Sequence, residues 1–342
     1  MRGASVTVSA ILLILVAIFA GSAVYFSISK TQNKIQNKAS EIMVSPKLEP
    51  KIVNYECFEN YAYFLIFMNQ DEVMKGSVPY LIEEGSDVIR SGGLSVNITR
   101  KGEIYFPGPF KKGHGYRLTI STNDWVMTRR CTAKLHPALM MHLPFSEGSG
   151  ARPKDRTSYD NDGTLTGGSW VGGVNDNAIL FDGSSDYVSV SDDADTLRPA
   201  QFTLSAWIYR DSNDANREGI VAKQDGTSGF ELSSLSNGNV QINVTGSGTS
   251  TQVTASVANS EWTHLTAIYN ATHVLLYKGC TLAGSAPANF SSAPSQLYVG
   301  KTDAGFFDGA IDEVRFYNIA LTPSEMSAFC QAETVQAGAY SG

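Results

Sequence analysis

The stretch FTLSAWIYR at residues 202–210 begins the part of the chain that decides the fold. It is an apolar stretch with the length and composition of a β-strand. Similar stretches follow at short intervals: FELSSL (230–235), NVQINVTG (239–246), WTHLTAIYN (262–270), THVLLYKG (272–279) and SQLYVGK (295–301). The separators are rich in Gly, Ser, Asp and Asn, and no long helical pattern interrupts the series. From Leu135 onward we therefore expect an antiparallel β-sandwich.

One short helix is predicted near the end of this region, at LTPSEMSAF (321–329). Thr322 can cap it, Pro323 suits the first helical position, and Glu325 stands three residues after the cap, as in a capping box. We expect the domain to run over residues 135–334, with a C-terminal tail over 335–342.

Residues 46–134 predict a small β-sandwich domain. Short apolar stretches alternate there with separators rich in Gly and Pro, such as PGPFKKGHG (107–115). The expected strands are KIVNYECF (51–58), YAYFLIFMN (61–69), GLSVNITR (93–100), YRLTISTN (116–123) and WVMTRRCTA (125–133). No cluster of catalytic side chains is visible in this domain.

The N-terminal segment has no charged residue between Ala4 and Ser29. As a helix it would be about 37 Å long, more than the roughly 30 Å hydrocarbon core of a bilayer. No Pro follows until Pro46, and isoleucines recur every seven residues at 28, 35 and 42. The pattern predicts one long N-terminal α-helix over residues 4–45. The predicted fold class is therefore mainly β with one long N-terminal α-helix.

Charge is distributed unevenly within the net charge of -7. Residues 135–342 carry 10 basic and 22 acidic side chains. A nucleic acid partner is excluded, because clustered Lys and Arg supply most of that affinity. The acidity suits cation binding or solubility.

Cysteines and glycosylation sequons favour a location outside the cytoplasm. The cysteines are Cys57, Cys131, Cys280 and Cys330. They have no CxxC spacing and are either free buried thiols or two disulfides. In the preferred pairing the first two bracket the small domain, and the last two lie within the next. Four N-x-[ST] sequons point the same way: Asn97, Asn243, Asn270 and Asn289.

Seven motifs occur in order between Leu139 and Phe329: LPFSEGSG, DNDGTLTGGSWVGGVNDNAILFDGSSDYVSV, FTLSAWIYR, IVAKQD, EWTHLTAIYN, LYVGK and FFDGAIDEVRFYNIALTPSEM. Together they resemble the laminin-G-like (LamG), concanavalin A-like sandwich domains of bacterial and archaeal surface proteins. The resemblance implies a jelly-roll β-sandwich of two large antiparallel sheets, and a binding role toward glycans or proteins.

The resemblance also suggests two kinds of site. Asp182, Asp186 and Asp312 match acidic positions that can hold a structural Ca²⁺ ion in similar sandwiches, since carboxylate oxygens suit calcium. The alternative places Asp182 in a tight turn and has Asp312 accept nearby backbone N–H groups. For ligand binding the candidates beside Gly-rich loops are Trp170, Tyr187, Phe306 and Phe307, whose rings can stack on a sugar or simply pack the core.

No enzyme activity is expected. Hydrolases on similar sandwiches carry closely spaced carboxylates on one strand, because the two groups must flank the scissile bond. No such run occurs, and the adjacent carboxylates in IDEV (311–314) should point to opposite faces of a strand.

The N-terminus resembles a second family. RG followed by ASVTVSAILLILVAIFAG (4–21) is similar to the class III signal of archaeal type IV pilins and archaellins. That resemblance implies a leader over residues 1–3, cut between Gly3 and Ala4 by a prepilin peptidase. Bacterial pilins have Glu at mature position five, where this chain has Val8.

The expected function is that of a structural subunit of an archaeal type IV pilus-like filament at the cell surface. Its precursor would be inserted in the membrane, its N-terminal helices would form the core of a homo-oligomeric filament, and its β-domains would bind carbohydrate or a surface glycoprotein. The alternative is a lectin-like adhesin held by a single membrane span. A secreted binding protein is a third reading.

Overall fold

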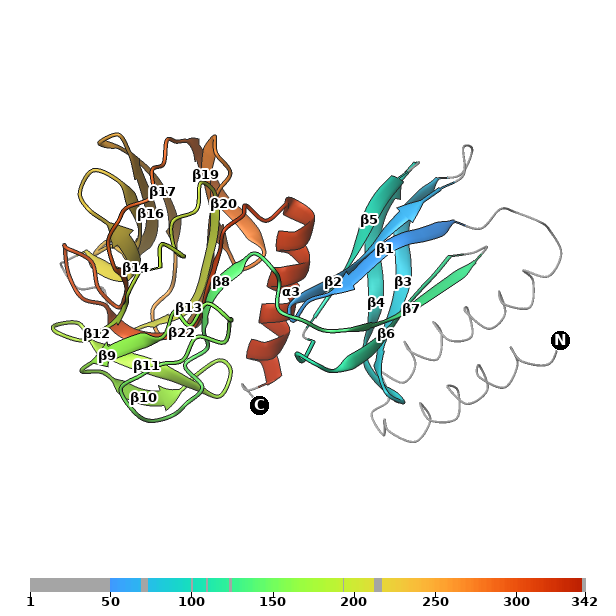
Figure 1. Ribbon diagram of the computed structural model, residues 1–342, viewed down its shortest axis with the longest axis horizontal. Helices are drawn as coiled ribbons and strands as arrows, with labels where there is room; N and C mark the ends of the chain where they lie inside the picture. Colours follow the sequence, from blue (N-terminus) through green and yellow to red (C-terminus); the bar gives the residue numbers. More distant parts are fainter. Residues whose placement is uncertain are drawn as a thin grey trace. The chain divides into compact units, whose positions relative to one another are not determined.

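The computed structural model describes residues 50–339, except for 69–72, 100, 109, 123–124, 193 and 212–216. The chain divides into two compact units at Lys134 and Leu135 (Figure 1). Each unit is a β-sandwich with its own hydrophobic core.

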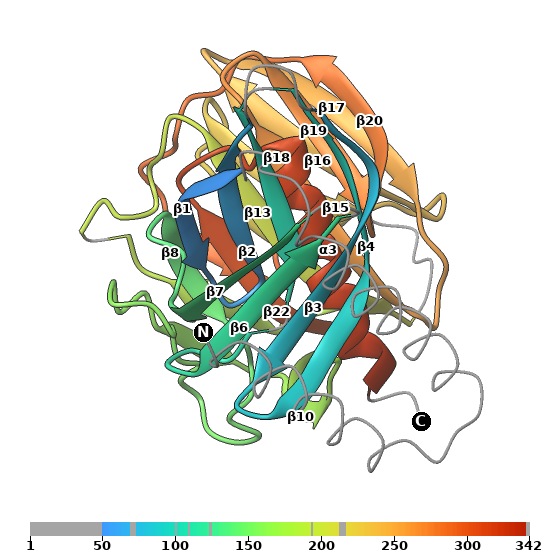
Figure 2. The ribbon, with the colours of Figure 1, turned by 90° about the vertical axis from the view of Figure 1, so that its right-hand side faces the viewer.

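The N-terminal unit pairs a three-stranded sheet, in the order β1-β2-β5, with a four-stranded sheet, in the order β4-β3-β6-β7. The four strands of the second sheet lie side by side in Figure 2. The strand bounds are β1 Lys51–Cys57, β2 Tyr61–Phe67, β3 Met74–Glu84, β4 Asp87–Ile98, β5 Lys101–Pro107, β6 Gly115–Ser121 and β7 Val126–Thr132. The sequence patterns marked five of these strands and missed β3 and β5.

A disulfide joins the two sheets of this unit, because Cys57 ends β1 and Cys131 lies in β7. Inward residues alternate along the strands, as in β6, where Leu118 and Ile120 are buried and Arg117 and Thr119 lie on the other face. The predicted small β-sandwich is confirmed by these two sheets and the core between them.

The C-terminal unit is a larger sandwich. An eight-stranded sheet runs in the order β10-β11-β22-β13-β18-β19-β20 with β8 beside β22, and a seven-stranded sheet runs in the order β17-β16-β15-β14-β21-β12-β9. The bounds are β8 Leu139–Leu143, β9 Gly163–Thr166, β10 Ser169–Gly172, β11 Asn177–Asp182, β12 Tyr187–Val190, β13 Phe202–Arg210, β14 Glu218–Gln224, β15 Gly229–Ser234, β16 Asn239–Gly246, β17 Thr249–Ser256, β18 Trp262–Tyr269, β19 His273–Lys278, β20 Thr281–Pro287, β21 Leu297–Val299 and β22 Asp308–Tyr317.

The core of this unit lies between the two sheets. Phe202 of β13 stacks on Phe230 of β15 and Phe316 of β22, with ring centroids 4.9 and 5.8 Å apart. All three rings are buried, so aromatic packing links the two sheets at the centre of the sandwich. The antiparallel jelly-roll β-sandwich predicted for this region is confirmed.

Helix α3, Pro323–Ala339, covers the outer face of the eight-stranded sheet (Figure 1). The backbone N–H of Thr322 donates to Glu325 at 2.8 Å, and that of Glu325 donates to Thr322 Oγ1 at 3.3 Å, so the predicted capping box is present. The helix continues to Ala339, past residue 334 where the sequence analysis ended the domain. The disulfide between Cys280 and Cys330 ties it to the β19–β20 turn.

The covered face of this sheet holds a buried charged cluster. His142 Nε2 lies 2.7 Å from Glu313 Oε2, and Arg315 donates to the same oxygen. Burial opposes ionisation of Glu313, but Arg315 and His142 outweigh it and hold its pKa well below the usual range. Phe329 of α3 closes the cluster, with its ring centre 5.9 Å from the Arg315 guanidinium carbon. These charges are therefore satisfied within the fold.

The predicted fold class is corrected in one respect. Among the described residues the one helix is α3, near the C-terminus, and the fold is otherwise nearly all β without a long N-terminal α-helix. The prediction rested on a local pattern, and most helical stability in proteins comes from tertiary packing, which such a pattern does not specify. Residues 4–45, to which it applied, lie outside the described residues, as do Gly3 and Ala4. In the described part of the chain, no helix is long and apolar enough to cross a membrane.

Candidate functional site

The outer face of the seven-stranded sheet carries a row of mostly polar side chains. Strand alternation sends Leu232 and Ile242 into the core and turns Glu231 and Asn243 outward. The strand register places seven outward residues directly opposite one another across the sheet: Thr164, Ser189, Tyr298, Ala222, Glu231, Asn243 and Gln252. Polar side chains from six strands, with Ala222 of β14 among them, thus form one row across the sheet.

An aromatic cluster lies at the β12–β21 end of this row. The rings of Tyr187, Tyr298 and Phe306 surround the ammonium group of Lys301, which lies 4.6, 5.1 and 5.5 Å from the three ring centres. Tyr187 contacts Tyr298 edge to face at 5.8 Å between centroids. All four side chains are half-exposed, so rings and ammonium are accessible from solvent.

A polar pocket of about 490 Å³ adjoins the cluster. It is lined by Ala151, Arg152, Asp160, Asp162, Thr164, Ser189, Ser191 and Gln296. Tyr298 donates its hydroxyl to Gln296 Oε1 at 2.9 Å, and Thr164 and Ser189 belong to the polar row. The pocket, the cluster and the row are therefore parts of one surface.

The charges of this pocket are fixed by short contacts. Lys154 donates to Asp162 Oδ2 at 2.6 Å, and Arg152 lies 3.3 Å from the same oxygen. Burial opposes ionisation of Asp162, but the hydrogen bond from Lys154 and the other contacts outweigh it and lower its pKa. Asp162 is thus an anion near neutral pH, held beside polar groups that can bind hydroxyls.

At the middle of the sheet, buried polar groups remain without partners. Arg217 Nε lies 2.7 Å from Glu231 Oε1 and donates to Ser233 Oγ at 3.1 Å. Burial raises the pKa of Glu231 against the effect of Arg217. Among the described residues, Asn243 Oδ1 and Gln241 Nε2 are buried and have no hydrogen-bond partner. These atoms are an acceptor and a donor buried within the face of the sheet.

The predicted ligand-binding aromatics are only partly brought together. Tyr187 and Phe306 share the cluster, with centroids 6.3 Å apart. Phe307 is fully buried in the core, and Trp170 lies in β10 of the other sheet, where its indole N–H donates to Gly150 O. Tyr298 and Lys301 were not predicted as site residues, because Tyr298 lies in the three-residue strand β21, which has only a weak alternating signal, and Lys301 follows that strand.

The predicted calcium ligands do not form one site. Asp182 accepts from the backbone N–H groups of Ser184 and Ser185, each at 2.8 Å, and these hydrogen bonds lower its pKa to about 2. Asp312 is fully buried and accepts from the N–H of Val174 at 2.9 Å.

Distance also separates these carboxylates. Asp186 lies beside Asp182, but β22 pairs Asp182 with Asp308, so Asp312 is four residues further on, about 13 Å along the strand. Within the described ranges, no three acidic, His or Cys side chains gather as a metal site. The donors present do not fit a calcium ion shared by these three residues.

The four sequon asparagines lie in different settings. Asn97, Asn270 and Asn289 are exposed, whereas Asn243 is 9% exposed in the middle of the polar row. A glycan needs open space at the side-chain nitrogen, which favours the three exposed positions and leaves Asn243 as a residue of the sheet face.

Comparison with known proteins finds a family model that matches part of the chain. Residues 182–327, less than half of its length, match the concanavalin A-like lectin/glucanases superfamily. This match supports the LamG, concanavalin A-like resemblance and spans most of both sheets of the C-terminal unit. No curated protein sequence matches the chain.

Solved structures with a similar fold include domain 4 of AbnA, a GH43 extracellular arabinanase from Geobacillus stearothermophilus, in complex with arabinotriose. It is 19% identical with a TM-score of 0.46, and the match covers 56% of this chain and 98% of that chain. Another is the binding domain of botulinum neurotoxin DC in complex with rat synaptotagmin II, 12% identical with a TM-score of 0.48, covering 57% of this chain and 52% of that chain. This chain thus matches about half the length of the neurotoxin domain.

Proposed function

We propose that the C-terminal unit binds carbohydrate on the outer face of its seven-stranded sheet. The observation that carries the proposal is the continuity of three half-exposed rings with a polar pocket and a row of polar side chains. Sugars present apolar C–H faces and many hydroxyls, and protein sites match them with aromatic rings and a few placed polar groups. The description of the matched family, lectin/glucanases, agrees with this class of ligand.

The aromatic cluster and the polar pocket would contact different parts of a sugar. Tyr187, Tyr298 and Phe306 offer ring edges and faces to the sugar, while Lys301 donates to its hydroxyls. Ser189 and Gln296 line the pocket and can bind further hydroxyls. The polar row continues across the sheet toward β17, which suits a chain of sugars rather than one ring.

The location that fits this activity is extracellular. Both preferred disulfides are present, Cys57 with Cys131 and Cys280 with Cys330, and such bonds persist in oxidising environments. The alternative of free thiols is thereby ruled out.

We propose further that the unit is displayed at the cell surface by the N-terminal segment. The resemblance of RGASVTVSA (2–10) to a class III signal favours a subunit of a pilus-like filament over a single-pass anchored adhesin. This step rests on sequence alone. Amino-terminal sequencing of the native protein tests it: a start at Ala4 supports the filament subunit, Met1 the anchored adhesin, and Val24 a secreted form.

A glycan array with the full-length protein tests the carbohydrate proposal. We expect binding to one glycan class, lost in Tyr298→Ala and Gln296→Ala and retained in Trp170→Phe, which changes an aromatic on the other sheet. Binding that survives both Tyr298→Ala and Gln296→Ala, or no binding to any glycan, contradicts the proposal. Because the three acidic residues do not form one site, chelation should leave the affinity unchanged.

The proposed activity is binding without cleavage. A bound oligosaccharide incubated with the protein should be recovered at its original mass. Shorter products that form with the native protein, but not with Tyr298→Ala or Gln296→Ala, would show a hydrolase instead.

A further inference from the structure

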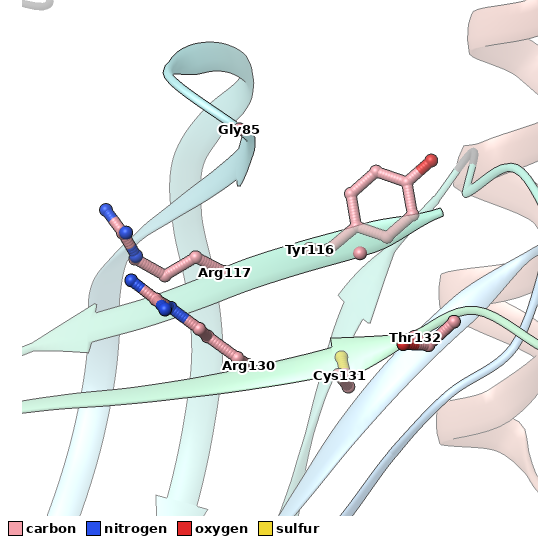
Figure 3. A pocket seen from close by; sticks show the side chains of 7 residues that line it. Gly85, Tyr116, Arg117, Arg130, Cys131 and Thr132 are labelled. Carbon is pink, nitrogen blue, oxygen red and sulfur yellow. The ribbon is translucent and has the colours of Figure 1, made fainter. Parts of the chain in front are cut away.

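The four-stranded sheet of the N-terminal unit carries a feature that the carbohydrate proposal does not use. Its adjacent strands β6 and β7 place Arg117 directly opposite Arg130. Both side chains lie on the outer face and extend in the same direction, side by side (Figure 3). Like charges directly opposite each other across a strand pair are destabilising. An anion bound near both guanidinium groups would reduce this repulsion.

The protein supplies one nearby carboxylate for the two cations. Glu83, opposite Arg117 on β3, has its carboxylate 3.5 Å from the Arg117 guanidinium. Burial raises the pKa of Glu83 against the charges of Arg117 and Arg130. Arg130 forms no hydrogen bond or close ion pair with any described residue, its side chain is exposed, and the neighbouring Glu84 is engaged by His114. Two cations thus share one carboxylate, which leaves a net positive charge at this place.

The two arginines line a pocket of about 400 Å³, together with Gly85, Gly115, Tyr116, Cys131 and Thr132. Gly85 lies at the β3–β4 turn with a φ of 62°, a conformation that favours glycine. A side chain at Gly85 or Gly115 would meet no atom within 4 Å, so the two glycines keep this space open. The volume is in the range of small-molecule sites.

We propose that this pocket binds an acidic monosaccharide unit through its carboxylate or sulfate group. The planar guanidinium of Arg130 can donate two parallel hydrogen bonds to such a group, and Arg117 adds a second cation beside it. Thr132 supplies a hydroxyl for the sugar ring. The site lies in the other unit from the sheet face proposed above and does not depend on it.

Isothermal titration of the full-length protein tests the site with glucuronate, glucose 6-sulfate and glucose. The acidic sugars should bind and neutral glucose should not, and the ratio of the two acidic affinities identifies the preferred anion. Arg130→Gln should weaken binding at least tenfold, as expected for a lost charge-assisted hydrogen bond. Higher ionic strength should weaken binding of the native protein.

Two variants distinguish binding in a specific pocket from nonspecific attraction of an anion to positive charge. Arg129→Gln removes the same charge from the same strand, but Arg129 is engaged by Thr128 O and the ring of Tyr55, so binding should stay unchanged. Gly115→Phe keeps both arginines and fills the open space on their side of the sheet, so binding should be lost.

Three results overturn the proposal: no binding of either acidic sugar, equal losses in Arg129→Gln and Arg130→Gln, or full binding in Gly115→Phe. Tyr298→Ala should not affect these titrations, so a failure here is distinct from a failure of the carbohydrate proposal. Thermal unfolding of each variant identifies any change that acts through the fold, and Arg130→Lys, which keeps the charge but loses the planar fork, should bind with intermediate affinity.

Discussion

The two outer faces of the C-terminal sandwich differ in what covers them. On the eight-stranded sheet, α3 lies over His142, Glu313 and Arg315, which make short contacts with one another. On the seven-stranded sheet, called the open face below, the three rings of the aromatic cluster are partly exposed. Both faces contain buried polar atoms without hydrogen-bond partners among the described residues, so the exposed rings, and not those atoms, distinguish the open face.

The same distinction separates the aromatic rings. Phe329 of α3 packs against His264 and Tyr317 with no exposed surface, so its contribution is to stability. Tyr298 has a comparable ring on the open face, where its contacts are Lys301, Tyr187 and Gln296. Variants on the covered face should change stability, and variants on the open face should change binding.

The largest expected effect follows removal of the disulfide that holds α3. Cys280→Ser with Cys330→Ser opens a link across 50 residues, which should lower the free energy of unfolding by about 4 kcal/mol. Chemical denaturation measures the loss. Glycan affinity of the folded fraction should stay the same, because the disulfide lies on the face that α3 covers. A parallel loss of affinity would contradict the assignment of binding to the open face.

A matched pair of ring truncations sharpens the comparison. Phe329→Ala should lower the free energy of unfolding by about 3 kcal/mol, because it empties a fully buried site. Tyr298→Ala should lower it by under about 1 kcal/mol, because that ring is half-exposed. Denaturation curves of both variants measure the difference, and equal losses would contradict the assignment of the open face.

Low pH should reduce the stability of the fold through His264, which lies on the face that α3 covers. Burial lowers the pKa of His264 to about 3, against 6.5 for the free side chain. The unfolded chain therefore binds the proton first, and stability is lost as pH falls from about 6.5 toward 3.

A His264→Phe variant isolates this contribution. Between pH 7 and pH 4.5 the native protein should lose about 2 kcal/mol of its free energy of unfolding through His264. The variant should not show this loss. Denaturation at the two pH values measures it. The same pH dependence in both proteins would place the acid sensitivity elsewhere.

The smallest effect is expected at Lys301. Lys301→Met keeps an unbranched side chain among the three rings but removes the ammonium donor, so stability should hardly change. Glycan affinity should fall about fivefold, the worth of roughly one hydrogen bond. Titration with the glycan found on the array measures this, and an unchanged affinity would remove Lys301 from the site.

Local signals in the sequence predicted a large part of the fold. The capping box at Thr322 and Glu325 depends on neighbouring residues and is present in the structure, and the predicted strand FTLSAWIYR forms β13. The pairing of cysteines within each domain was also correct. The predicted long N-terminal helix falls on residues 4–45, outside the described part of the chain, where the one helix is α3 and the fold is nearly all β.

The candidate site was harder to predict, because it is assembled from distant strands. Tyr187 and Tyr298 are 111 positions apart in sequence and meet through the pairing of β12 with β21. Asn243 was marked by its sequon, although the same alternation that turns it outward places it in the polar row. For Asp312, the structure decides between the two interpretations of the sequence: backbone N–H groups donate to its carboxylate, as the alternative predicted.

The most direct test of the account is hydrogen–deuterium exchange of the full-length protein with and without the glycan that binds on the array. The account predicts slower exchange in β12, β14, β15, β16 and β21 and in the loop around Gln296, with no change in α3 or β18. Protection confined to α3 and the eight-stranded sheet, or to the N-terminal unit, would contradict the assignment of carbohydrate binding to the open face.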